Sequence, residues 1–324
     1  MFHRIPTVLT AQELIDKAFL RASKITEPRQ KTLEEKTRKE IIDRIATIES
    51  IVTGHLLKIE KKFPSTDRIH PFHRDLFDLM FDLDAYKVSI SHLNWAASKI
   101  RDISTSHIAS VKKAQTRNRM LEIMKAYYGR ISSVLHGVDK DLAFLRSCRD
   151  SIKRIPDLDP DSPTFILAGM PNVGKSSLLN RLTGNISTVA PYPFTTKNIT
   201  IGYRDISYSR AQIVDTPGIL DRSMEDRNDM ERKAILALRD IPGTILFLID
   251  HSETSGYTLA EQEKLFTEIV NSFKKTVIRV QSKYDLSGTC KEEICVSSET
   301  GYGMDRLLEL MTRMVQDVEQ KSAG

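Results

Sequence analysis

The spacing of hydrophobic residues changes once along the 324-residue chain. In the first half, hydrophobic residues recur at steps of three and four, which predicts amphipathic helices. The longest series is Ile41, Ile45, Ile48, Val52, Leu56 and Ile59. Further upstream, Thr10 and Glu13 have the spacing of a capping box, which predicts the start of a helix containing Leu14, Ala18 and Ile25.

Further helical patterns follow in the first half. They cover residues 72–83 and 86–103, and a near-heptad repeat then runs from Met120 to Leu145. Hydrophobic stripes of this kind usually form a core, so we expect an antiparallel helical bundle.

In the second half, short hydrophobic segments alternate with helical ones. The expected strands are 164–168, 198–203, 211–214, 243–250, 275–280 and 293–296, and the expected helices are 176–183, 224–239, 258–273 and 303–319. This alternation predicts βαβ units and a mostly parallel sheet, which binds ligands at the carboxyl ends of its strands.

A segment rich in proline and aspartate, residues 155–163, separates the two patterns. The sequence therefore predicts two domains of α+β class. They are a basic helical bundle at 1–156 and an α/β domain at 164–324, joined by a linker at 157–163.

Composition limits the function classes. The chain is 40% hydrophobic and 28% charged, which is typical of a soluble globular protein. No hydrophobic run approaches the roughly 20 residues that span a bilayer, and the first residues lack a signal peptide. We expect an intracellular, cytoplasmic protein. Cys148, Cys290 and Cys295 form neither a disulfide framework nor a metal-ligand spacing, so reduced thiols are expected.

Charge is distributed unevenly between the two halves. Residues 1–156 contain 29 Lys and Arg against 19 Asp and Glu, a balance of +10, whereas the remainder has a balance of −5. Eight basic residues cluster between residues 99 and 130 against only two acidic ones, Asp102 and Glu122. They are Lys99, Arg101, Lys112, Lys113, Arg117, Arg119, Lys125 and Arg130. Such a cluster is either a solvated helix face or an RNA-binding surface.

Residues 169–176, GMPNVGKS, follow a hydrophobic strand and precede a helix. This is the context in which GxxxxGK[ST] forms a phosphate-binding loop. Gly169 and Gly174 allow the tight turn, Lys175 reaches the β and γ phosphates, and the Ser176 hydroxyl binds Mg²⁺.

Asp215-Thr216-Pro217-Gly218 directly follows the expected strand 211–214. We expect this segment to be a nucleotide-dependent switch. Its carboxylate suits the Mg²⁺ shell, and the Gly218 N–H suits the γ-phosphate. Between the two motifs lies YPFTT, residues 192–196, in which either Thr195 or Thr196 could complete the shell; we favour Thr196.

Two motifs predict selection of guanine. In Ser282-Lys283-Tyr284-Asp285, the Asp285 carboxylate can accept two hydrogen bonds that guanine offers and adenine does not. In residues 297–299, SSE, a backbone N–H can meet the guanine O6. The expected nucleotide-binding residues are Gly169, Met170, Pro171, Asn172, Val173, Gly174, Lys175, Ser176, Ser177, Asp215, Thr216, Pro217, Gly218, Ile219, Ser282, Lys283, Asp285, Ser297, Ser298 and Glu299.

The motifs GMPNVGKSS, DTPG, SKYD and SSE, in this order, resemble those of translation-factor-related GTPases, and PYPFTT resembles the first switch of the Obg-related branch. Residues 69–72, IHPF, and the helices to about residue 155 resemble the N-terminal bundle of Nog-type nucleolar GTP-binding proteins. The resemblance covers most of the chain. It implies a P-loop GTPase that assists assembly of the large ribosomal subunit, with ribosomal RNA or a subunit precursor as partner.

The sequence departs from the family pattern in two respects. Ser282 replaces an Asn or Thr, which would weaken the tie between the base site and the phosphate-binding loop. The long C-terminal extension of eukaryotic relatives is missing after residue 324, so we expect a short, archaeal-like form that is monomeric when free.

Ile219 follows Gly218 where many small GTPases have a glutamine that orients water, which predicts slow intrinsic hydrolysis. Asn172 resembles the asparagine of potassium-activated GTPases, but it is equally explained by a tight turn. The expected catalytic residues are Lys175, Thr196, Gly218 and Asn172, and the expected Mg²⁺ ligands are Ser176, Thr196 and Asp215. Two alternatives stay open: an RNA-binding scaffold whose GTP site scarcely turns over, and a GTPase acting in transfer RNA or translation processes. A membrane partner is not expected, because no lipidation motif or hydrophobic amphipathic anchor is visible.

Overall fold

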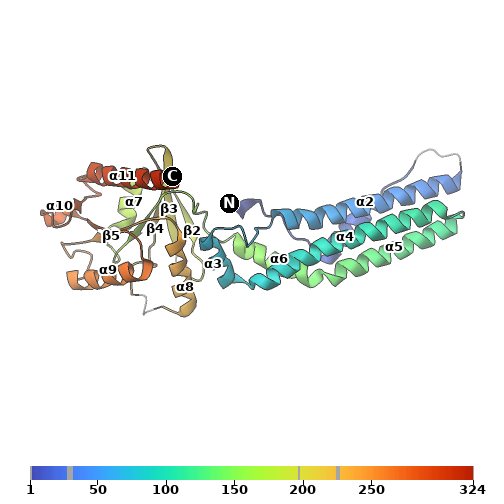
Figure 1. Ribbon diagram of the computed structural model, residues 1–324, viewed down its shortest axis with the longest axis horizontal. Helices are drawn as coiled ribbons and strands as arrows, with labels where there is room; N and C mark the ends of the chain where they lie inside the picture. Colours follow the sequence, from blue (N-terminus) through green and yellow to red (C-terminus); the bar gives the residue numbers. More distant parts are fainter. Residues whose placement is uncertain (1, 28–31, 196–197, 224–226, 324) are drawn as a thin grey trace. The chain divides into compact units, whose positions relative to one another are not determined.

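The chain forms two compact units, each described here by itself. The computed structural model describes residues 2–27, 32–195, 198–223 and 227–323. Residues 2–68 and 80–153 form the bundle unit, and residues 69–79 with the chain from residue 154 onward form the sheet unit. Figure 1 labels the elements of both.

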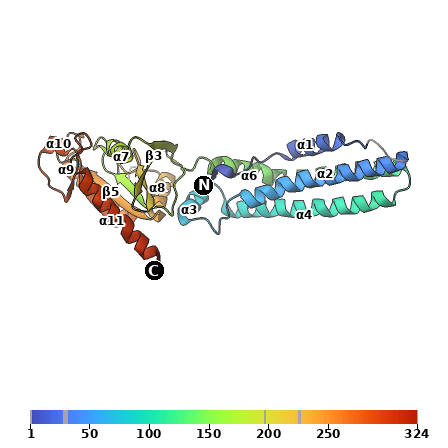
Figure 2. The same ribbon diagram turned by 90° about the horizontal axis from the view of Figure 1, so that it is seen from above.

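The bundle unit is helical, as predicted. After a short 3₁₀ helix, η1 (Phe2–Arg4), it contains α1 (Ala11–Ser23), α2 (Leu33–Lys62), α4 (Leu83–Lys113), α5 (Arg117–Gly137) and α6 (Asp139–Ile152). α2 packs along both α4 and α5, and α1 lies beside α2 (Figure 2). α4 and α5 run antiparallel, because only residues 114–116 join them.

The start of α1 agrees with the sequence, but its end does not. The Thr10 hydroxyl accepts the Glu13 N–H, and the Glu13 carboxylate accepts the Thr10 N–H, so the predicted capping box is confirmed. The helix ends at Ser23, so Ile25 lies outside it. A second capping box at Thr32 and Glu35 starts α2.

A buried tyrosine joins three helices of the bundle. The Tyr127 hydroxyl lies 2.9 Å from the Ser104 Oγ on α4 and donates to the Ile45 carbonyl of α2 at 3.3 Å. Burial raises the pKa of Tyr127 to about 12, so the phenol is neutral at physiological pH. One side chain of α5 is thus hydrogen-bonded to both neighbouring helices within a hydrophobic core.

The sheet unit begins with α3 (Pro71–Met80) and continues with a seven-stranded sheet in the order β2-β3-β4-β1-β5-β6-β7. Its strands are β1 (Thr164–Ala168), β2 (Ser187–Pro191), β3 (Asn198–Ile206), β4 (Ser209–Asp215), β5 (Gly243–Ile249), β6 (Val277–Gln281) and β7 (Ile294–Cys295). Its other helices are α7 (Lys175–Thr183), α8 (Asp229–Ala237), η2 (Leu238–Asp240), α9 (Leu259–Phe273), α10 (Tyr284–Ser287) and α11 (Met304–Ala323).

The mostly parallel sheet is confirmed, and two elements were missed. Among the described strands, two neighbouring pairs, β2–β3 and β3–β4, are antiparallel, and the other pairs are parallel. β2 escaped prediction because it is a short, largely exposed edge strand that ends in Pro191. α10 is a four-residue helix that starts in the SKYD segment and ends at Ser287, too short for a hydrophobic period. Residues 224–226 of the expected helix 224–239 lie outside the described residues.

The proline-rich segment expected to be a linker packs onto the sheet unit. Leu158 is buried, the Gln212 side chain accepts the Asp159 N–H at 2.9 Å, and the same side chain donates to the Asp159 carbonyl at 2.7 Å. Residues 69–79 also cluster with this unit, whereas the sequence pattern placed them in the bundle. Among the described residues, no helix combines the length and the hydrophobicity needed to cross a membrane.

We expect Tyr127→Phe to destabilise the bundle by about 1 kcal/mol, because it removes a buried hydroxyl from two hydrogen-bond partners, Ser104 Oγ and the Ile45 carbonyl, while preserving the ring. The free energy of unfolding in urea checks this. Tyr128→Phe, at a partly buried neighbour, is the control; equal losses in the two variants would contradict the role given to Tyr127.

Candidate nucleotide-binding site

The predicted motifs come together at one edge of the sheet. β1 pairs in parallel with both β4 and β5, and β5 pairs in parallel with β6. The segments that follow β1, β4 and β6 therefore leave the sheet at the same edge. These segments are GMPNVGKS, the end of DTPG and SKYD, respectively.

The loop after β1 has the geometry of a phosphate cradle. Gly169 has φ +133°, and a Cβ at this position would lie 2.5 Å from the Leu248 carbonyl oxygen, so only glycine fits. Gly174 has φ +99° and directly precedes α7. The loop therefore delivers backbone N–H groups to the N-terminus of a helix, where a phosphate is stabilised.

Lys175 is buried in this loop. Its Nζ donates to the carbonyls of Gly169, at 2.7 Å, and Met170, at 2.8 Å. Burial lowers the pKa of Lys175, and the negative charges of Asp221 and Asp215 oppose that change. The ammonium is thus held at the mouth of the cradle by weak backbone acceptors that phosphate oxygens can replace.

Asn172 adopts a left-handed backbone conformation, with φ 61°. Asparagine tolerates this region better than most residues do. The conformation explains an asparagine here without a cation, and a potassium ligand stays a prediction.

Ser176 and Asp215 meet as expected of a shared metal site. The Ser176 hydroxyl donates to the Asp215 Oδ2, and the other carboxylate oxygen, Oδ1, is buried without a hydrogen-bond partner among the described residues. Burial raises the pKa of Asp215, and the Ser176 bond and Lys175 charge partly oppose this. A buried carboxylate oxygen beside a hydroxyl is a suitable donor pair for Mg²⁺.

The first switch segment is only partly described. Tyr192 is buried, and its hydroxyl donates to the Ala234 carbonyl in α8 at 2.7 Å. The Thr195 hydroxyl donates to the Tyr192 carbonyl at 3.0 Å, which engages it in a local turn. Thr196, the favoured metal ligand and a predicted catalytic residue, lies outside the described residues.

The second switch segment contains contacts that the sequence did not indicate. The Gly218 N–H donates to the Asp221 Oδ2 at 2.6 Å. Arg227 donates to the carbonyls of Gly218 and Ile219, and its side chain is fully buried beside Glu231, at 3.2 Å. Ile219 is fully buried, and its hydrocarbon side chain has no group that could hydrogen-bond an attacking water. Asp221 and Arg227 belong to no phosphate-binding motif. In the sequence, only their closeness to DTPG could have suggested that they contact the second switch segment.

The base-recognition segment is attached to the end of β5. The Ser282 hydroxyl donates to the carbonyl of Ile249, the last residue of β5, at 3.3 Å. This hydrogen bond joins the base-recognition segment to β5. The Lys283 Nζ lies 2.9 Å from the buried Asp250 carboxylate. Burial of Asp250 acts to raise its pKa, but hydrogen bonds from Ser252, Lys283 and the Ser255 N–H outweigh it and lower the pKa to about 2.

Asp285 is exposed at the start of α10, where its carboxylate is accessible to a base. Ser297 is fully buried, and its hydroxyl accepts the Thr300 N–H at 3.1 Å. Sequence reasoning missed Tyr302, whose ring stacks on Tyr284 with centroids 4.0 Å apart and planes at 8°. This stack connects the SKYD segment to the segment after SSE.

The expectation of three reduced thiols was wrong for two of them. Cys290 and Cys295 form a disulfide with a Cα–Cα distance of 5.8 Å, which the turn leading into β7 brings about. In the sequence, we considered only a framework of several disulfides or a metal-ligand spacing, and neither pattern reveals one local disulfide. Cys148 is free and buried, and burial raises the pKa of its thiol to about 12.

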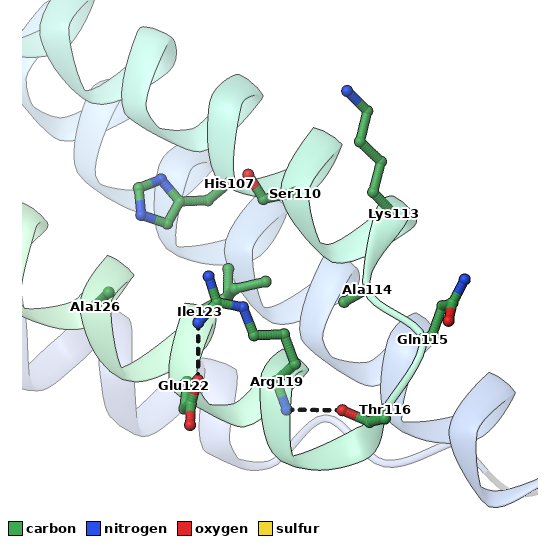
Figure 3. Close-up of a pocket in the computed structure, with 10 residues that line it drawn as sticks. All are labelled: His107, Ser110, Lys113, Ala114, Gln115, Thr116, Arg119, Glu122, Ile123 and Ala126. Carbon is green, nitrogen blue, oxygen red and sulfur yellow. Dashed lines mark hydrogen bonds and ion pairs between the residues drawn. The ribbon is translucent and has the colours of Figure 1, made fainter.

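The eight basic residues proposed for RNA are all exposed on α4, α5 or the adjoining turn. Two of them, Lys113 and Arg119, line a cavity of about 550 Å³ at the α4–α5 turn (Figure 3). Arg119 forms an ion pair with Glu122 at 2.9 Å on the exposed helix surface. Arg38, missed in the sequence, donates to the Ala114 carbonyl at 2.9 Å and thereby ties α2 to this turn.

Comparison with known proteins gives matches over both units. Residues 2–159 match the family described as the NOG1 N-terminal helical domain, and residues 164–283 match the family described as 50S ribosome-binding GTPase. An uncharacterized protein of Methanocaldococcus jannaschii is 37% identical over 88% of this chain and 81% of that protein.

Two eukaryotic relatives carry the name nucleolar GTP-binding protein 1. The Drosophila melanogaster protein is 38% identical over 71% of this chain and 36% of its own length. The Arabidopsis thaliana protein is 39% identical over 71% of this chain and 35% of its own length. The chain thus matches about a third of these longer relatives.

We expect Ser176→Ala to weaken Mg²⁺-dependent nucleotide binding by roughly tenfold, because it removes the hydroxyl beside Asp215 from the donor pair. Fluorescent GDP titrations with Mg²⁺ and with EDTA check this. Affinity in EDTA should be unchanged, and Ser187→Ala, on the exposed edge strand β2, is the control. A matching loss in EDTA would show that the serine supports the loop rather than the metal.

Proposed function

Because the chain belongs to the NOG1 family of GTP-binding GTPases, we propose that it is a switch that assists assembly of the large ribosomal subunit. In this proposal, the bundle unit docks on ribosomal RNA, and the GTP state of the sheet unit times docking or release. The matched GTPase family is named for 50S ribosome binding, and eukaryotic relatives are named for the nucleolus, where ribosomal subunits are assembled.

The observation that carries the docking proposal is the α4–α5 end of the bundle. Basic side chains lie exposed there around a cavity whose lining includes Lys113, Thr116 and Arg119. Lysine and arginine neutralise phosphates, and hydroxyl groups add hydrogen bonds to the backbone of a nucleic acid. The lining also includes Glu122, which pairs with Arg119, so the cavity offers two cations and a hydroxyl to a folded RNA beside one acidic group.

The nucleotide site supports slow intrinsic hydrolysis. Lys175 and the loop N–H groups bind the phosphates, while the buried Ile219 offers no group that could orient water. Mg²⁺, when bound by Ser176, Asp215 and Thr196, supplies positive charge against the phosphate oxygens. A partner would then supply the acceleration. The same isoleucine also favours the second candidate, an RNA-binding scaffold with a scarcely active site.

We expect Lys113→Gln with Arg119→Gln to weaken co-sedimentation with large ribosomal subunits, by roughly tenfold near 100 mM salt. The slope of log affinity against log salt should become shallower by about 2, since two phosphate contacts are lost. Lys61→Gln with Lys62→Gln, at the end of α2, makes the same charge change elsewhere on the bundle unit.

The wild-type measurements are made with GTP, GDP and a non-hydrolysable analogue. If six or more phosphates are contacted, affinity should fall by about 10³ or more between 50 and 200 mM salt. A flat salt profile, equal losses in both double variants, or binding only to free transfer RNA would each refute the docking proposal.

We further propose that K⁺ at Asn172 stimulates hydrolysis by placing positive charge near the transferred phosphate. Turnover should then be at least about tenfold faster in KCl than in NaCl at equal ionic strength. Asn172→Gly preserves the left-handed conformation while removing the amide, so it should abolish the difference. Equal rates in the two salts would exclude the potassium site.

A further inference from the structure

The second switch contains a carboxylate bound to the N–H that a γ-phosphate needs. The Gly218 N–H donates to the Asp221 Oδ2 at 2.6 Å, a short bond between a backbone donor and a charged acceptor. Asp221 is only 9% exposed, so this contact is screened little by water. A backbone N–H that donates to this carboxylate cannot donate fully to a phosphate at the same time.

The Asp221 charge also acts on a second phosphate-binding group, without a direct hydrogen bond to it. The negative charge of Asp221 acts on the Lys175 ammonium, the residue that binds β and γ phosphates in loops of this type. Asp221 also lines a cavity of about 500 Å³ together with Met170, Pro171 and Gly218. Asp221 therefore binds one N–H on which a γ-phosphate depends and lies where the phosphate-binding loop meets the switch.

The backbone carbonyls that directly follow this N–H are also held in place. Arg227 donates to the carbonyls of Gly218 and Ile219, and Glu231 pairs with this arginine at 3.2 Å. These bonds fix the carbonyls of residues 218 and 219 while the Gly218 N–H points to Asp221. The arrangement is a built conformation with buried partners rather than a chance contact of a surface side chain.

We infer that Asp221 is a nucleotide-state discriminator: its carboxylate occupies the Gly218 N–H, a donor that the γ-phosphate needs, and so disfavours GTP relative to GDP. GTP binding has to break the Asp221 contact, because the γ-phosphate and the carboxylate are both anions and use the same backbone donor. GDP has no γ-phosphate and leaves the contact intact. The inference rests on guanine-nucleotide binding by the proposed switch, and not on the docking of RNA.

Removal of the charge tests this inference. In Asp221→Asn and Asp221→Ala, we expect the affinity for a non-hydrolysable GTP analogue, relative to that for GDP, to rise by roughly tenfold. Alanine should have at least the effect of asparagine, since it removes the acceptor completely. Both affinities are measured by calorimetry on the full chain without RNA, at low and high salt.

Asp229→Asn is the matched control, because it removes one negative charge from an 89% exposed side chain in the nearby helix α8. It should leave the ratio unchanged. The Gly218 amide resonance of the ¹⁵N-labelled GDP complex gives an independent reading: it should shift upfield in Asp221→Asn and stay in place in Asp229→Asn.

Three outcomes would overturn the inference. The first is an equal change in the affinities for the GTP analogue and for GDP. The second is a change in the ratio of these affinities that Asp229→Asn reproduces or that high salt abolishes. The third is a loss of GDP binding in both Asp221 variants, which would mean that Asp221 supports the structure of the site. Failure of the wild-type chain to bind either nucleotide would instead refute the nucleotide switch itself. Failure of RNA docking leaves the measured ratio unaffected.

Discussion

Parallel pairing of β1 with both β4 and β5 is the constraint on which the nucleotide site depends. This pairing places the phosphate-binding loop between the second switch and the base-recognition segment, because all three follow strands that end at the same edge. The close approach of Gly169 to the Leu248 carbonyl is a direct consequence, since β5 lies immediately beside the loop. Residues more than 100 positions apart in the sequence thereby lie at one edge of the sheet.

Polar contacts at this edge connect the site to the switches. Ser176 joins the start of α7 to the end of β4 through Asp215, and Tyr192 joins the first switch segment to α8. Arg227 then fastens the backbone that follows Asp215. A change at the phosphates can therefore reach α8 through two different segments, which is the arrangement expected of a bistable element.

The bundle unit combines a hydrophobic core with a cationic end. Tyr127 satisfies its hydroxyl within that core, so the three helices that it joins have a defined mutual register. Arg38 ties the α4–α5 turn to α2. The exposed cations near this turn are therefore displayed on a fixed framework, which would reduce the conformational entropy lost in the proposed docking on RNA.

The sequence by itself determined the helical bundle, the mostly parallel sheet and the phosphate-binding loop, because these depend on hydrophobic period and on local motifs. It also indicated that Ser176 and Asp215 would meet, since a known motif order implies a shared edge. Only the tertiary structure decided the packing of residues 157–163 onto the sheet unit, the Cys290–Cys295 bridge and the Asp221 contact. Each of these contacts forms because the fold brings polar or sulfur atoms close together in a particular turn or across a surface. A hydrophobic period or a local motif contains no information about the distance between such atoms.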